Sequence, residues 1–107
     1  MWTIDTIRAG RVIAILRGQF DEREKEIAEI LLEAGVTAVE VTLNSPDALV
    51  AIKRISSGLG NRMAVGAGTV LSSEDVKRAA DSGAQFIVSP NRNTTVIHMT
   101  KKLDLLS

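Results

Sequence analysis

Short apolar runs alternate with amphipathic segments along the whole chain. The apolar runs are rich in Val, Ile and Ala and are bounded by Gly, Pro, Ser or Asn, a pattern typical of buried strands. Strands are therefore predicted over residues 11–16, 38–43, 63–67 and 85–89, with the opening of a fifth over 103–106. The run at 11–16 is apolar throughout, which predicts a strand buried on both faces.

The segments between these runs carry apolar residues at helical spacing. Helices are predicted over 2–9, between Asp21 and Gly35, between Ser45 and Gly58, between Ser72 and Gly83, and over 93–101.

Several of these helices have recognisable start signals. Asp21 and Glu24 have the spacing of a capping box. Ser45 precedes Pro46, which suits an N-cap followed by proline at the first helical position. Ser72 is a candidate N-cap for the helix that follows it.

Four consecutive strand–helix units predict an α/β fold with a parallel sheet and right-handed crossovers. No linker divides residues 1–107, so one domain is expected. A small open sheet and part of a (β/α)8 TIM barrel, which normally takes about 200 residues or more, both fit this pattern. The barrel is favoured because polar residues gather at the carboxyl ends of the strands, where a barrel collects its catalytic groups. These residues are Arg17, Glu40, Asn44, Thr69, Ser89 and Asn91.

Glu40 is the most informative of these polar residues, because it lies inside an apolar, β-branched run. Strand alternation places Val39 and Val41 on one face and Glu40 and Thr42 on the other. A buried carboxylate is costly unless it is paired or its pKa is shifted. Glu40 is therefore either the partner of a core Lys or Arg, or an acid that lines a site.

Two further segments are candidate ligand contacts. Gly66 to Thr69 follow a strand and precede a helix, but Leu71 occupies the position where the dinucleotide fingerprint requires glycine. The glycines of this segment either relieve crowding or let a ligand approach the backbone. Arg17 ends a strand and either is solvated or holds a carboxylate or phosphate.

Composition excludes several classes of function. The chain of 107 residues has 13 basic and 13 acidic side chains, so its charge gives no support to nucleic-acid binding. It has no Cys and a single His, His98, which argues against a metal site. No apolar run approaches the roughly 18 residues of a membrane span. The amino terminus lacks the pattern of a signal peptide, so a soluble, cytoplasmic protein is expected.

Four motifs together resemble the 2-keto-3-deoxy-6-phosphogluconate aldolase family. They stand in the family's order and spacing over nearly the whole chain, at Ile13–Gly18, Ala38–Pro46, Val65–Leu71 and Gly83–Asn91. Asn44 lies where the gluconate enzymes often carry Arg, and this version resembles the 6-phosphogalactonate branch more closely. Both substrates remain open at this point.

The resemblance implies a TIM barrel, a homotrimer and a class I aldolase that needs no metal or organic cofactor. In such an enzyme a lysine forms a Schiff base with the keto group, and cleavage of the phosphorylated keto-deoxy sugar acid yields pyruvate and glyceraldehyde 3-phosphate. Glu40 matches the family's general acid/base. Thr69 and the Gly68 backbone match the group that holds the pyruvate carboxylate, Arg17 matches a substrate-binding arginine, and Pro90 matches a residue of the pocket wall.

The lysine of that mechanism has no counterpart within the 107 residues. In the family it lies in a Lys-x-Phe-Pro strand well beyond position 107, so residues 1–107 are expected to be the barrel's amino-terminal half and to be inactive alone. The lysines that are present all fall in predicted helices and outside this motif: Lys25, Lys53, Lys77, Lys101 and Lys102.

Two other hypotheses remain beside the aldolase. One is a non-catalytic half-barrel that associates with itself through the open sheet edges at 11–16 and 103–106. The other is a different phosphate-handling (β/α)8 enzyme, such as an isomerase or a synthase.

Overall fold

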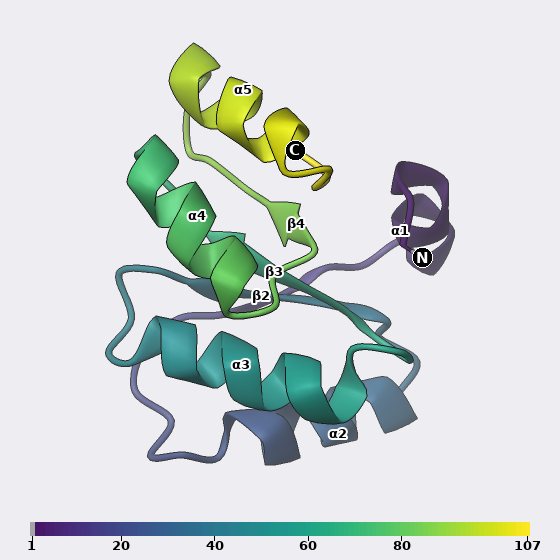
Figure 1. Cartoon of the computed structure of the whole chain (residues 1–107). Coiled ribbons are helices and arrows are strands. Elements are labelled where there is room, and N and C mark those ends of the chain that lie inside the picture. Colours follow the sequence, from purple (N-terminus) through teal and green to yellow (C-terminus); the bar gives the residue numbers. More distant parts are fainter. Residues whose placement is uncertain (1) are drawn as a thin grey trace.

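The computed structural model describes residues 2–107 and contains one curved, parallel sheet with its helices packed against it (Figure 1). The strands pair in the order β1-β2-β3-β4, so each strand lies beside the next one along the chain. This confirms the predicted alternation and the parallel sheet. The elements are α1 (Ile4–Gly10), β1 (Ala14–Leu16), α2 (Glu24–Glu33), β2 (Ala38–Thr42), α3 (Ala48–Leu59), β3 (Ala64–Gly68), α4 (Ser73–Asp81), β4 (Phe86–Ile87) and α5 (Thr94–Lys102).

The main core lies between the sheet and helices α2 to α5. Figure 1 shows α2 and α3 side by side below the strands, and α4 and α5 above them. Val39 and Val41 of β2 and Val65 of β3 face this layer, and each is at most 1% exposed. Ile52 and Ile55 of α3 pack against them and are fully buried. Burying each such side chain contributes about 1.5–3 kcal/mol to stability, so this burial determines which face of each strand packs against the helices.

The opposite face of the sheet carries the polar residues. The strand register aligns Ile15, Glu40, Gly66 and Phe86 in one row, so they emerge on the same side. At the amino ends of the strands this inner face is closed by Ile7 of α1, which packs in a small second core with Phe86. The carboxyl ends of the strands carry the candidate site.

The prediction that residues 11–16 form a strand buried on both faces is wrong. Only residues 14–16 form β1, and Val12, Ile13 and Ile15 are 52%, 40% and 56% exposed. The reason is the place of β1 in the sheet. It has β2 as its single neighbouring strand, and within residues 2–107 nothing covers its inner face.

Two of the three predicted helix caps are also wrong. Helix α2 begins at Glu24 with Arg23 in the N-cap position and no side-chain cap, because the loop before it turns through left-handed backbone at Asp21. Helix α3 begins three residues after Ser45, whose hydroxyl is used elsewhere. The third prediction is confirmed, since the Ser72 hydroxyl accepts the first-turn Asp75 N–H at 3.2 Å.

The chain's last residues bear out only part of the predicted fifth strand. Leu103 and Asp104 turn out of α5, and Asp104 has a φ of 58°. Leu106 then forms an isolated parallel bridge with Phe86 of β4. In residues 2–107, no helix combines the length and apolar character that crossing a membrane requires.

Candidate active site

Glu40 is a buried acid in the middle of the inner face. It is 5% exposed, and its Oε2 atom has no hydrogen-bond partner among residues 2–107. Its carboxyl group lies over the backbone of β3 at Gly68, where a Cβ atom would come within 2.9 Å of Cδ and Oε1. Glycine at position 68 thus makes the space that the carboxyl group occupies.

Burial raises the pKa of Glu40 above its ordinary value near 4.5, and the positive charge of Arg17 opposes that rise. The desolvation of the carboxyl group is the larger effect. An acid whose pKa is moved towards neutrality can both take up and release a proton, which is what a general acid/base must do.

Arg17 and Thr69 lie on either side of Glu40, at the carboxyl ends of the strands that flank β2. The Arg17 Nη2 atom donates to the Thr69 hydroxyl at 3.5 Å, across the end of the sheet. Arg17 is exposed and Thr69 is half-buried, so both can reach a ligand. Thr69 has a φ of 55°, a left-handed conformation that a β-branched residue rarely adopts.

The predicted site residues therefore fall into two groups. Glu40, Gly68, Arg17 and Thr69 come together at one place on the inner face. Asn44 and Pro90 are exposed on the loops that follow β2 and β4, and within residues 2–107 neither bonds to a side chain of the first group.

Two buried hydroxyl groups lie beside this cluster; the sequence placed Thr42 on the same face as Glu40 but predicted Ser45 only as a helix cap. Thr42 is fully buried and Ser45 is 8% exposed, and their side-chain oxygens are 2.9 Å apart. The Ser45 hydroxyl also accepts the Gly18 N–H at 2.9 Å. In the sequence, the spacing of three positions between Thr42 and Ser45 was the signal that could have indicated their contact. Their partner Gly18 could not be recognised, because it lies 27 residues away from Ser45.

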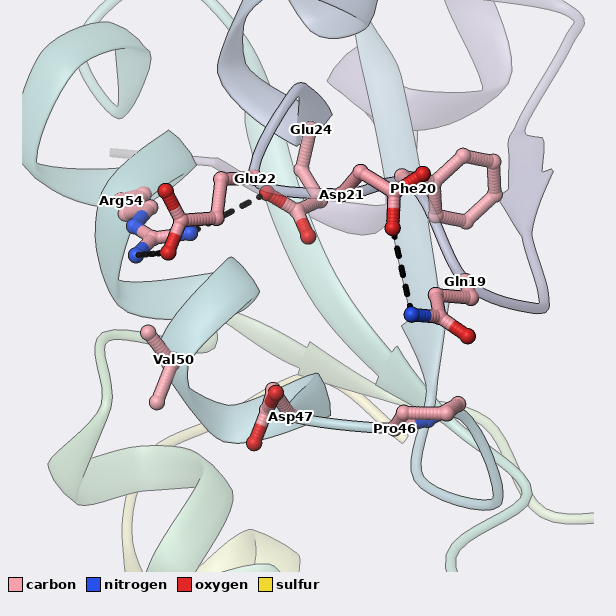
Figure 2. Close-up of a pocket in the computed structure, with 9 residues that line it drawn as sticks. All are labelled: Gln19, Phe20, Asp21, Glu22, Glu24, Pro46, Asp47, Val50 and Arg54. Atoms are coloured by element: carbon pink, nitrogen blue, oxygen red, sulfur yellow. Dashed lines mark hydrogen bonds and ion pairs between the residues drawn. The ribbon is translucent and has the colours of Figure 1, made fainter.

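A separate cleft of about 390 Å³ opens nearby, between the loop before α2 and the start of α3 (Figure 2). Asp21, Glu22, Glu24 and Asp47 line it together with one cation, Arg54. Arg54 contacts Glu22 and Glu24 at 3.5 Å each. The excess of carboxylates would repel an anionic ligand, so this cleft is unsuited to one.

No group of three or more His, Asp or Glu side chains in residues 2–107 is arranged to hold a metal ion. The chemistry available at the cluster is that of an acid/base, a guanidinium and a hydroxyl.

Comparison with known proteins decides the family. The family described as "KDPG and KHG aldolase" matches residues 3–106. The chain belongs to this aldolase family. Its members are aldolases, enzymes of the lyase class, and the neighbouring solved structures of the family have a TIM-barrel-like fold.

Individual relatives agree with this assignment. A probable 2-dehydro-3-deoxy-6-phosphogalactonate aldolase of Rhizobium meliloti is 41% identical over 82% of this chain and 42% of its own length. A 2-dehydro-3-deoxy-phosphogluconate aldolase of Zymomonas mobilis is 40% identical over 84% of this chain and 43% of its own. A solved structure described as native KDPGal has a TM-score of 0.83 at 38% identity, over 87% of this chain and 45% of that one.

The chain thus spans less than half the length of each of these three relatives. Both galactonate and gluconate enzymes are among its relatives, the two galactonate enzymes at 41% identity and the gluconate enzymes at 27–40%.

Proposed function

We propose that these residues form the acid/base half of a class I aldolase that cleaves a 2-keto-3-deoxy-6-phospho sugar acid to pyruvate and glyceraldehyde 3-phosphate. The observation that carries the proposal is Glu40, a buried carboxyl group with an unpartnered oxygen, which lies between Arg17 and Thr69 in a chain of this family. The proposed setting is a cytoplasmic homotrimer built from complete barrels, of which residues 1–107 are the amino-terminal half.

Glu40 transfers protons in this proposal. While a lysine supplied by the rest of the barrel condenses with the keto group, Glu40 moves protons to and from the carbinolamine oxygen. After the carbon–carbon bond breaks, it moves a proton at the pyruvate carbon of the enamine. A carboxyl group with a raised pKa has both protonation states within reach for these steps.

Arg17 and Thr69 orient the substrate in the same scheme. The guanidinium of Arg17 holds a substrate carboxylate, and the Thr69 hydroxyl with the Gly68 backbone holds the carboxylate of the pyruvate portion. Pro90 and Asn44, on neighbouring loops, are proposed to border the pocket.

Residues 1–107 alone are proposed to be inactive, because class I chemistry needs an amine nucleophile at the site. All five lysines of the chain are exposed on helices, and none lies in a strand. Incubation of the 107-residue chain with pyruvate and borohydride should therefore give no reduced adduct by mass spectrometry. A stoichiometric adduct on one lysine would overturn this part of the proposal.

The gene beyond codon 107 tests the proposal itself, since a Lys-x-Phe-Pro strand should follow. In that longer protein, Glu40→Gln should lower kcat by about 10²–10⁴-fold. Glu29→Gln is the matched control, because Glu29 is half-exposed in a surface pair with Lys25 and should leave kcat unchanged. A Glu40→Gln enzyme with the parent kcat would refute the role given to Glu40.

Self-association of the half-barrel is a second candidate, favoured by the exposed apolar residues of the unpaired β1 edge. Val12, Ile13 and Ile15 are each at least 40% exposed there. Sedimentation of the 107-residue chain distinguishes the two cases: a folded dimer favours self-association, and an aggregating or disordered chain favours an incomplete barrel. Membership in the aldolase family argues against the third hypothesis, a different phosphate-handling barrel enzyme.

A further inference from the structure

The loops that follow β1 and β2 are joined by a hydrogen-bonded bridge centred on Ser45. Its hydroxyl accepts the Gly18 N–H at 2.9 Å and shares a second hydrogen bond of 2.9 Å with the Thr42 hydroxyl. The Ser45 N–H also donates to the Thr42 carbonyl at 3.0 Å, which closes a tight turn directly after β2. Ser45 is 8% exposed, so water does not compete effectively for these bonds.

The bridge acts on the peptide unit that Arg17 shares with Gly18. Gly18 has a φ of 118°, a conformation that favours glycine, and its N–H points at Ser45. The hydrogen bond to this N–H holds the plane of the peptide bond between Arg17 and Gly18. It therefore also restrains the position of the Arg17 Cα atom, from which the side chain extends. Arg17 is exposed, and within residues 2–107 its side chain makes one hydrogen bond, a long one of 3.5 Å to Thr69, which holds it weakly.

The bridge also reaches the strand of the buried acid. Thr42 is fully buried, two residues after Glu40 on β2, and alternation places both on the inner face. The Leu43 N–H donates to the Gly68 carbonyl at 2.9 Å, which continues the pairing of the β2 end with β3. The strand ends that carry Glu40 and Gly68 are therefore held, while the loop that carries Arg17 is attached to them through Ser45.

We propose that Ser45 is a positioning residue, whose hydroxyl holds the loop after β1 so that the Arg17 guanidinium stays within reach of Glu40 and Thr69. The residue does not touch the reacting atoms. It acts through Arg17, and in the enzyme its loss would weaken the hold on the substrate carboxylate. This last consequence rests on the proposed function, whereas the positioning of Arg17 does not.

The pKa of Glu40 reports where Arg17 lies, because Arg17 lowers it. Carbon-13 NMR titration of the carboxyl group in the longer protein, without substrate, measures this pKa independently of the aldolase reaction. Arg17→Gln sets the reference, since it removes the opposing charge and should raise the pKa of Glu40. Ser45→Ala should raise it in the same direction by most of that amount, and Ser45→Thr, which keeps the hydroxyl, should restore the parent value.

A double variant separates positioning from general loosening of the structure. In the Arg17→Gln background, Ser45→Ala should leave the pKa of Glu40 unchanged, because there is no longer a charge to position. Ser72→Ala is the matched control: it also removes a serine hydroxyl that accepts one backbone N–H, but at the start of α4. It should lower stability and leave the pKa of Glu40 where it was.

Three results would overturn the proposal: no rise with Ser45→Ala, an equal rise in the Arg17→Gln background, or the same rise with Ser72→Ala. If the Ser45→Ala chain does not fold, Ser45→Cys keeps the size of the side chain and replaces the hydroxyl with a weaker acceptor. The pKa of Glu40 should then lie between those of the parent and Arg17→Gln, and a parent value would also refute the proposal. A failed aldolase assay in the longer protein, with these NMR results intact, would count against the proposed function alone.

Discussion

Gly68→Ala tests whether glycine at position 68 creates the space for the Glu40 carboxyl group. An alanine Cβ there would lie 2.9 Å from Cδ and Oε1 of Glu40 and 3.0 Å from Oε2. Ordinary contacts begin near 3.4 Å, so the carboxyl group must move by about 0.5 Å in a close-packed region. Crowding of this kind costs about 1–3 kcal/mol.

The backbone at position 68 is not itself an obstacle to alanine, because Gly68 is not among the glycines with a positive φ. If the carboxyl group is removed first by Glu40→Ala, Gly68→Ala should become neutral or stabilise the chain by about 0.4–1 kcal/mol through the unfolded state. The two substitutions should therefore be coupled by about 1–4 kcal/mol in a double-mutant cycle.

Urea unfolding of the longer protein, followed by far-UV circular dichroism, measures each free energy. Gly68→Ala alone should lower the midpoint by about 0.5–2 M at an unchanged slope. Gly66→Ala is the matched control on the same strand face, because its Cβ would meet the ring of Phe86 instead. Equal costs of Gly68→Ala with and without the Glu40 carboxyl group would refute the reasoning, as would rescue of Gly66→Ala by Glu40→Ala.

Two further predictions concern buried acids. Because burial raises the pKa of Glu40 in the folded chain, the charged form opposes folding; this cost is absent below pH 4.5 and grows as the pH rises through the folded-state pKa. The stability of Glu40→Gln relative to the parent should therefore increase between pH 4 and pH 7, by about 1.4 kcal/mol for each unit by which the folded-state pKa of Glu40 exceeds the unfolded-state pKa. A stability difference that does not change with pH in urea unfolding would contradict this. Arg54→Met leaves Glu24, whose side chain is 8% exposed, without its ion pair. This should cost about 1–3 kcal/mol in the same assay, because the Arg54 side chain is 39% exposed and water offsets part of the loss. Glu22→Gln, at a partner that is 81% exposed, should cost at most about 0.5 kcal/mol, and equal costs for the two variants would refute the role of burial.

Sequence reasoning was most reliable where the signal is local. Alternation along residues 38–42 is enough to predict that Glu40 lies on the other face of the strand from Val39 and Val41, and the structure confirms this. The Ser72 cap was likewise predictable, because the hydroxyl and the Asp75 N–H it accepts are three residues apart. Side-chain direction and helix capping depend on the residue spacing of a strand or a helix turn, and this spacing involves only residues close in the sequence.

The failures arose where the outcome depends on distant segments. The apolar run at 11–16 has the composition of a buried strand, yet Ile15 is 56% exposed because β1 lies at the sheet edge. Ser45 followed by Pro46 reads locally as a helix start, but the Gly18 N–H, 27 residues away, takes up its hydroxyl. A polar group bonds to the partner that the fold brings to it, and the local pattern does not name that partner.

The sequence by itself determined the order of strands and helices, the face from which the acid projects, and the family to which the chain belongs, since each depends on residue types at fixed spacings. Only the tertiary structure decided that the Glu40 carboxyl group packs over Gly68, that Arg17 reaches Thr69, and that Ser45 holds the intervening loop. These contacts join residues between 27 and 52 positions apart. Their geometry follows from how the strands are paired and registered, because that pairing sets which side chains come within bonding distance.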